Sequence, residues 1–147
     1  MVVAAAMAAM WCATVPLAAQ GSNYSVVDNP FQEEFDYAIG TDLEPGVEVD
    51  GVQWVRFSLR PRSDREFPPD RPVPVIVELD LVNTSDSADI LVIVLFEDEH
   101  GIALDRLELG SISAGRDRPR EVVQKHKVIA SVLDATRKVY LFFEVSR

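Results

Sequence analysis

The chain has 147 residues and carries 24 acidic against 14 basic side chains, a formal net charge of −10 at pH 7. Nucleic acid and anionic membrane surfaces bind proteins through basic patches, so this acidic balance argues against both as partners. The length suits a single domain with its own core.

Residues 1–19 form an uncharged apolar segment rich in Ala, Val and Met, which is typical of a secretory signal. The apolar run over 2–15 is followed by Pro16-Leu17-Ala18-Ala19, and we expect cleavage after Ala19. Export would place the protein in the periplasm, the cell envelope or the extracellular space. It would also remove Cys12, the only cysteine, so the mature protein would have no disulfide and no thiolate nucleophile.

Two alternatives for this segment stay open. A retained membrane anchor needs about 20 apolar residues, which this run approaches, and a membrane partner is expected only in that case. A lipoprotein would carry its lipid on Cys12, but Trp11 stands where such signals have a small side chain.

Beyond this segment, a polar stretch over 20–32 is expected to be flexible, and 33–147 are predicted to form one domain. Only 129–136 suits a short helical turn, and Asp50-Gly51 predicts a type I′ hairpin turn. Short apolar and alternating segments predict strands over 34–39, 47–49, 52–60, 75–82, 102–109, 122–129 and 139–145. The run over 90–96 is uniformly apolar, which predicts a strand that is covered on both faces or central in its sheet. This pattern predicts an all-β fold, an antiparallel immunoglobulin-like β-sandwich of about seven or eight strands.

Trp54 lies in the predicted strand over 52–60. Strict alternation places it on the polar side with Arg56, opposite Phe57. Trp54 is therefore either an exposed platform for a sugar ring or a protein anchor, or a cover for the end of the core.

The stretch over 60–74 contains five prolines and alternates acids with arginines, which predicts an exposed loop. Loops of this length are often functional. The stretch is either a partner-binding loop, with Arg62, Arg65, Phe67 and Arg71 as candidate contacts, or a mobile crossover between two sheets.

Charge is unevenly distributed along the chain. Residues 28–50 hold eight acids and no base, and a later segment holds the candidate partner-binding residues Arg116, Arg118, Arg120, Lys125 and Lys127. These segments are either two solvated faces, or complementary patches for head-to-tail assembly or for a charged partner, because charge complementarity governs orientation and association rate.

Two acidic groups are candidate ligands for a divalent cation such as calcium: Glu97-Asp98-Glu99-His100, and the set Asp36, Asp42, Glu44 and Glu48. Successive strand side chains point to opposite faces, so neither group forms a site by itself, and we expect no metal and no cofactor. The sequence contains no Gly-x-Ser-x-Gly elbow, Gly-rich phosphate loop or His-Glu-x-x-His helix, and we predict no catalytic residues.

Three turn segments are similar to those of a known family: Val82-Asn83-Thr84-Ser85, Phe96 through Gly101, and Ser113-Ala114-Gly115. The stretch 77–115 resembles the small immunoglobulin-like domains of exported bacterial proteins, including the FxLYD-type group. The resemblance implies a secreted or cell-envelope binding or structural module and supplies no catalytic residues.

The sequence therefore predicts an exported, non-catalytic binding or structural module that contacts a protein partner or a second copy of itself. One alternative is a small carbohydrate-active or hydrolytic domain, which an exposed Trp54 beside two carboxylates on a concave face would favour. Another is a membrane-tethered accessory subunit that retains the N-terminal segment.

Overall fold

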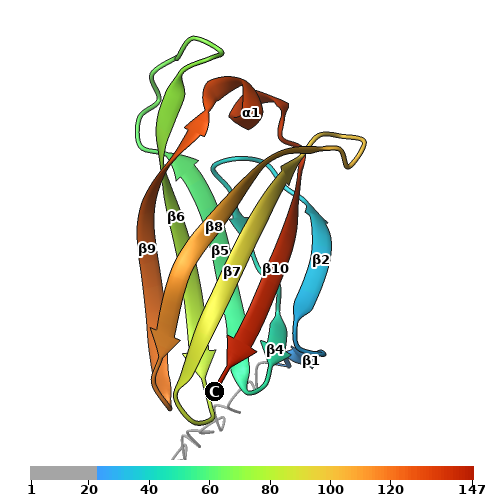
Figure 1. Cartoon of the computed structure of the whole chain (residues 1–147), viewed down its shortest axis with the longest axis vertical. Helices are drawn as coiled ribbons and strands as arrows, with labels where there is room; N and C mark the ends of the chain where they lie inside the picture. Colours follow the sequence, from blue (N-terminus) through green and yellow to red (C-terminus); the bar gives the residue numbers. More distant parts are fainter. Residues whose placement is uncertain (1–22) are drawn as a thin grey trace, which may run out of the picture.

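The computed structural model describes residues 23–147, which form two β-sheets packed face to face and one short helix (Figure 1). The predicted signal segment and its cleavage site after Ala19 lie outside the described residues. The elements in chain order are β1 (Ser25–Val26), β2 (Phe31–Asp36), β3 (Asp42–Leu43), β4 (Val47–Val49), β5 (Val52–Pro61), β6 (Pro72–Asn83), β7 (Ala88–Glu97), β8 (Ala103–Ala114), β9 (Arg118–Ile129), α1 (Ala130–Ala135) and β10 (Lys138–Ser146).

We call the two layers sheet A and sheet B. Sheet A has the strand order β1-β4-β5-β6-β9, with β3 also paired to β5, and sheet B has the order β2-β10-β7-β8. The short β1–β4 pair is parallel and the other described pairs are antiparallel. The chain passes between the sheets at the β1–β2, β2–β3, β6–β7 and β8–β9 connections, and again through α1 between β9 and β10. The prediction of an all-β, mainly antiparallel fold is confirmed.

Most predicted elements are found at their expected places. The strands expected over 75–82, 90–96, 122–129 and 139–145 lie within β6, β7, β9 and β10, and the predicted helical turn is α1. The predicted hairpin turn joins β4 to β5, with φ of 45° at Asp50 and 76° at Gly51. A Cβ on Gly51 would lie 2.7 Å from the Cβ of Ser85, so the turn needs glycine for space as well as for conformation.

The stretch over 20–32, which is expected from its sequence to be flexible, contains β1 and the first two residues of β2. Phe31 pairs with Phe143 of β10 and is 5% exposed. The Asn29 side chain donates to the Val145 carbonyl at 2.7 Å and accepts its N–H at 3.1 Å, which extends the β2–β10 ladder. One aromatic residue in a polar stretch gives no periodicity, so the strand expected over 34–39 begins earlier than predicted, at Phe31, and ends at Asp36.

The core is built from side chains of both sheets. Trp54 and Phe57 project from β5 of sheet A and meet Phe143 of β10 in sheet B. The Trp54 and Phe143 rings are stacked, with centroids 4.9 Å apart, and Trp54 is edge-on to Phe57 at 6.2 Å. All three side chains are fully buried. These aromatic contacts join the two layers at their centre.

The interpretation of Trp54 as an exposed platform is wrong. The β5–β6 register shifts between Trp54 and Arg56, which marks Val55 as the extra residue of a β-bulge. A bulge reverses the alternation of faces, so Trp54 and Phe57 both point inward. The indole N–H donates to the Arg56 carbonyl at 3.1 Å, which satisfies the one polar group of the buried ring.

Among residues 23–147, no helix is long and apolar enough to cross a membrane.

Replacing Trp54 by Ala should lower the free energy of unfolding by about 3–5 kcal/mol, because a large cavity opens between the sheets. Trp54→Phe should cost less, since it keeps an aromatic ring against Phe143. Urea denaturation measures both values. Ile102→Ala, at a side chain 61% exposed, is the control and should change stability by no more than about 0.5 kcal/mol. A cost for Trp54→Ala as small as that of the control would contradict the central place of this ring.

Candidate functional site

A concavity lies at one end of the molecule, between the connection over 62–71 and α1 (Figure 1). Its volume is about 520 Å³. The floor is apolar and is formed by Ile39, Pro61, Phe67, Val73, Ala130 and Leu133. The rim is polar and is formed by Ser63, Asp64, Arg65, Glu66 and Asp134. We call this concavity the loop–helix cavity.

Hydrogen bonds attach the loop to the start of α1. The Ala130 N–H donates to the Arg71 carbonyl and the Ser131 N–H donates to the Pro69 carbonyl, each at 2.9 Å. These N–H groups belong to the first turn of the helix, where they have no partner within the helix. The loop therefore supplies the acceptors that the start of α1 requires. The same hydrogen bonds hold the second half of the loop against α1.

The first half of the loop forms the open side of the cavity. The Arg62 N–H donates to the Pro74 carbonyl at 2.9 Å, and the Arg65 N–H donates to Ser63 Oγ at 3.2 Å. Phe67 turns back and packs, half-buried, against the core. The loop is thus fixed at both ends and by its aromatic side chain, which argues against a mobile crossover.

The cavity has the chemistry of a binding site for an apolar group. Its volume falls in the range of about 300–1,000 Å³ that is usual for ligand pockets. Rim charges of both signs, on Asp64, Arg65, Glu66 and Asp134, surround an aliphatic and aromatic floor. Such a site takes an apolar side chain and orients it through polar contacts at the edge.

The structure brings together only some of the predicted contact residues. Arg65 and Phe67 line the cavity, and Arg62 and Arg71 are exposed on the same loop. Trp54 is excluded by its burial. Sequence reasoning missed Ile39 and Leu133. The i, i+3 spacing of Ala130 and Leu133 on the predicted helical turn was the one available signal, and the approach of Ile39 is a property of the whole fold.

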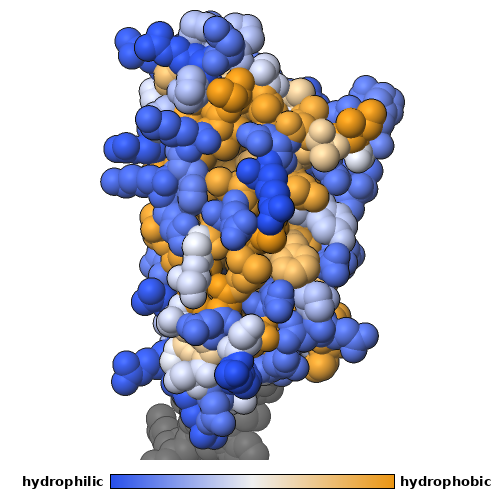
Figure 2. Space-filling view, viewed as in Figure 1, coloured by the Kyte–Doolittle hydropathy of each residue, from blue (hydrophilic) through white to orange (hydrophobic). Residues whose placement is uncertain are grey.

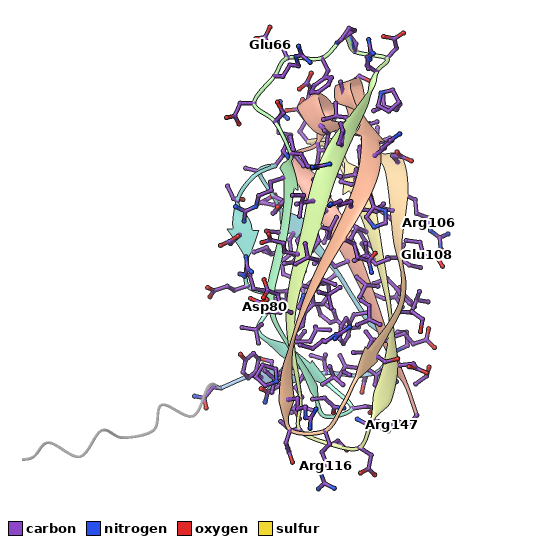
Figure 3. The ribbon with its side chains drawn as sticks, turned by 90° about the vertical axis from the view of Figure 1, so that its left-hand side faces the viewer. Glu66, Asp80, Arg106, Glu108, Arg116 and Arg147 are labelled. Atoms are coloured by element: carbon purple, nitrogen blue, oxygen red, sulfur yellow. The ribbon has the colours of Figure 1, made fainter. Side chains whose placement is uncertain are left out.

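The five predicted basic residues do not form one cluster. Arg116 is at the end of the molecule opposite Glu66 of the loop, as Figure 3 shows. The others are spread along β9, and all five side chains are exposed. The basic segment therefore marks a whole edge of sheet A.

An ion-pair network covers the outer face of sheet A. Arg56 Nε lies 2.7 Å from Asp80 Oδ2, and Arg56 Nη1 lies 3.3 Å from Glu78 Oε2. Asp42 Oδ1 contacts both Arg56 and Arg60, at 3.4 and 3.2 Å. The acidic neighbours raise the pKa of Arg56. Within the set Asp36, Asp42, Glu44 and Glu48, which was the second candidate for metal binding, the Asp42 carboxylate is therefore engaged in ion pairs with two arginines.

The acidic group Glu97-Asp98-Glu99-His100 also has a structural role. Asp98 Oδ1 accepts the N–H groups of His100 and Ile102 at 2.8 and 2.9 Å, which closes the β7–β8 turn and lowers the Asp98 pKa. Within residues 23–147, no three His, Cys, Asp or Glu side chains are placed to hold a metal ion.

Glu97, beside this turn, is a buried carboxyl group at 7% exposure. Its Oε2 atom has no hydrogen-bond partner among the described residues. Burial and the neighbouring Glu34 carboxylate raise the Glu97 pKa, whereas an ion pair of 2.6 Å with Lys138 lowers the pKa of Glu34. Glu34 and Lys138 therefore stabilise each other's charged forms, while Glu97 is protonated more easily than an ordinary carboxyl group.

The outer face of sheet B carries an apolar stripe. Figure 2 shows apolar residues along the middle of this face, interrupted by polar residues and flanked by others at the margins. A shallow groove of about 180 Å³ lies there, lined by Ile93, Leu95, Arg106, Tyr140 and Phe142. The uniformly apolar run over 90–96 was expected to be covered on both faces or central. It is central in the sheet, with its outward side chains half-buried.

Comparison with known proteins gives no match: no family model fits this chain, and no curated protein matches it.

Glu97→Gln should change stability in a pH-dependent way. Because the folded-state pKa of Glu97 is raised above 4.5, its contribution to stability is present at low pH and is lost as the pH rises through the raised value. The glutamine variant does not titrate there. We therefore expect the glutamine variant to be more stable relative to wild type at pH 8 than at pH 4, that is, its free energy of unfolding minus that of wild type should be larger at pH 8.

Chemical denaturation at the two pH values measures this difference. Glu99→Gln, which removes one negative charge from a side chain 74% exposed, is the matched control. If the free energies of unfolding of Glu97→Gln and wild type differ by the same amount at both pH values, the Glu97 carboxyl does not contribute a pH-dependent term to stability, and the prediction is wrong.

Proposed function

We propose that this protein is an exported, non-catalytic binding module with an immunoglobulin-like sandwich, and that it contacts a protein partner through the loop–helix cavity. The observation that carries the proposal is the cavity itself, an apolar floor of suitable volume under a polar rim. The bound group would be an apolar side chain of the partner, seated against Phe67 and Leu133.

The way the loop is held supports this proposal. Binding loops placed on a rigid scaffold lose little conformational entropy on association. Hydrogen bonds from Ala130, Ser131 and Arg62 already fix the loop backbone. The partner would therefore meet a largely preformed surface.

An exposed Trp54 would have favoured the carbohydrate-active or hydrolytic alternative, and this side chain is fully buried. The membrane-tethered alternative depends on residues 1–19, which lie outside the described part of the chain. Export likewise rests on the sequence of that segment, and the mass of the natively produced protein would test it: a species lacking the first 19 residues is expected.

A photo-crosslinking residue at position 66 should capture the partner, because Glu66 lies on the rim of the cavity. The same residue at position 116 is the matched control, since Arg116 is also exposed and lies at the opposite end (Figure 3). Adding Phe67→Ala should reduce the position-66 product about tenfold or more, because truncating an aromatic anchor typically costs about 2 kcal/mol.

Two results would contradict the proposal. One is an equal yield of the same product from positions 66 and 116. The other is a position-66 product whose yield does not change with Phe67→Ala, provided that the variant unfolds at the same denaturant concentration as wild type.

A further inference from the structure

Two edges of the molecule have opposite charge and matching backbone geometry. Within residues 23–147, β9 forms one edge of sheet A and β2 forms one edge of sheet B. Figure 1 shows them on opposite sides of the molecule. The β9 edge carries four exposed basic residues, Arg118, Arg120, Lys125 and Lys127, against one acid, Glu121, whereas β2 has the sequence Phe-Gln-Glu-Glu-Phe-Asp.

The hydrogen bonding of β9 shows which of its backbone groups point outward. The Ala130 N–H donates to Arg71, and the residues of antiparallel strands alternate between bonding the partner and facing away. The even-numbered residues of β9 therefore bond to β6. The backbone groups of Lys125, Lys127 and Ile129 face the outer edge, and the Lys125 and Lys127 side chains are exposed on the outer face of sheet A.

The same reasoning applies to β2. The Tyr37 N–H donates to the Arg137 carbonyl, so the odd-numbered residues of β2 bond to β10. The backbone groups of Gln32, Glu34 and Asp36 face the outer edge, and their side chains are exposed on the outer face of sheet B. Phe31 and Phe35 point inward to the core.

We propose that β9 of one molecule pairs antiparallel with β2 of a second copy, so that the protein assembles head to tail. The register that aligns the outward-facing backbone groups places Lys127 opposite Glu34 of the partner copy and Lys125 opposite its Asp36. Ile129 then lies opposite Gln32. Opposite charges facing one another across paired strands stabilise the junction.

Charge also selects this junction over the others that edge strands permit. A β9–β9 pair would place lysines and arginines against one another, and a β2–β2 pair would do the same with carboxylates. Like charges at a junction suppress wrong pairings. Pro119 on β9 has no N–H to offer along the lower part of that edge, which leaves 125–129 as the part suited to strand addition.

The two strands run in the same direction in one molecule, as the antiparallel pairings along both sheets require. An antiparallel junction therefore needs the second copy turned end over end. This rotation brings sheet B of the second copy into the layer of sheet A of the first, so that each junction continues a sheet. Because the two contact surfaces differ, the assembly does not close at two copies.

Charge exchange tests the junction. In one variant Lys125→Glu and Lys127→Glu make both edges acidic, and in the other Glu34→Lys and Asp36→Lys make both edges basic. Sedimentation of the protein as the cell produces it, over a concentration series, should show wild type forming dimers and longer species. Each variant alone should remain monomeric, and an equimolar mixture of the two should assemble again, because every junction then joins an acidic to a basic edge.

Several results would overturn the proposal: wild type that stays monomeric over the series, variants that still assemble, or a mixture that does not. Assembly that is lost in Phe142→Ser but survives both charge variants would assign the contact to the apolar stripe of sheet B. Glu34 also pairs with Lys138, so Asp36→Lys alone serves as the basic variant if the double substitution lowers the unfolding midpoint.

Discussion

The stacking of Trp54 on Phe143 is the contact on which the two-layer structure depends. It joins β5 of sheet A to β10 of sheet B through the largest buried side chain of the described residues. The bulge at Val55 makes it possible, because without that extra residue the indole would leave the core. The same bulge leaves Arg56 opposite Asp80 on the outer face, where it organises the ion-pair network.

Much of the fold was predictable from local pattern, since β6 alternates regularly, β7 is a uniformly apolar run and Asp50-Gly51 specifies its own turn. The errors arose where local pattern and tertiary structure differ. One bulged residue reversed the orientation of Trp54. Phe31 stood alone in a polar stretch, and its burial depends on Phe143, more than a hundred residues away.

The candidate site was predictable in part for similar reasons. Prolines and arginines marked the loop, and Arg65 and Phe67 do line the cavity. The rest of the floor comes from Ile39 and Leu133, which only the folded chain brings to the same place. The basic residues between Arg116 and Lys127 are neighbours in the sequence, but most of them lie in the extended strand β9, which spreads them along the molecule. These exposed residues therefore mark an edge of sheet A and not a compact patch.

The two ends of the molecule differ in what they carry. The loop–helix cavity occupies one end, and the first described strand and the C-terminus both lie at the other (Figure 1). A fluorophore, affinity tag or fused domain attached behind Arg147 would consequently sit a full molecular length from the cavity. Immobilisation through that terminus would present the cavity to solution in a uniform orientation, which suits the chain to surface-based binding measurements without redesign of its loops.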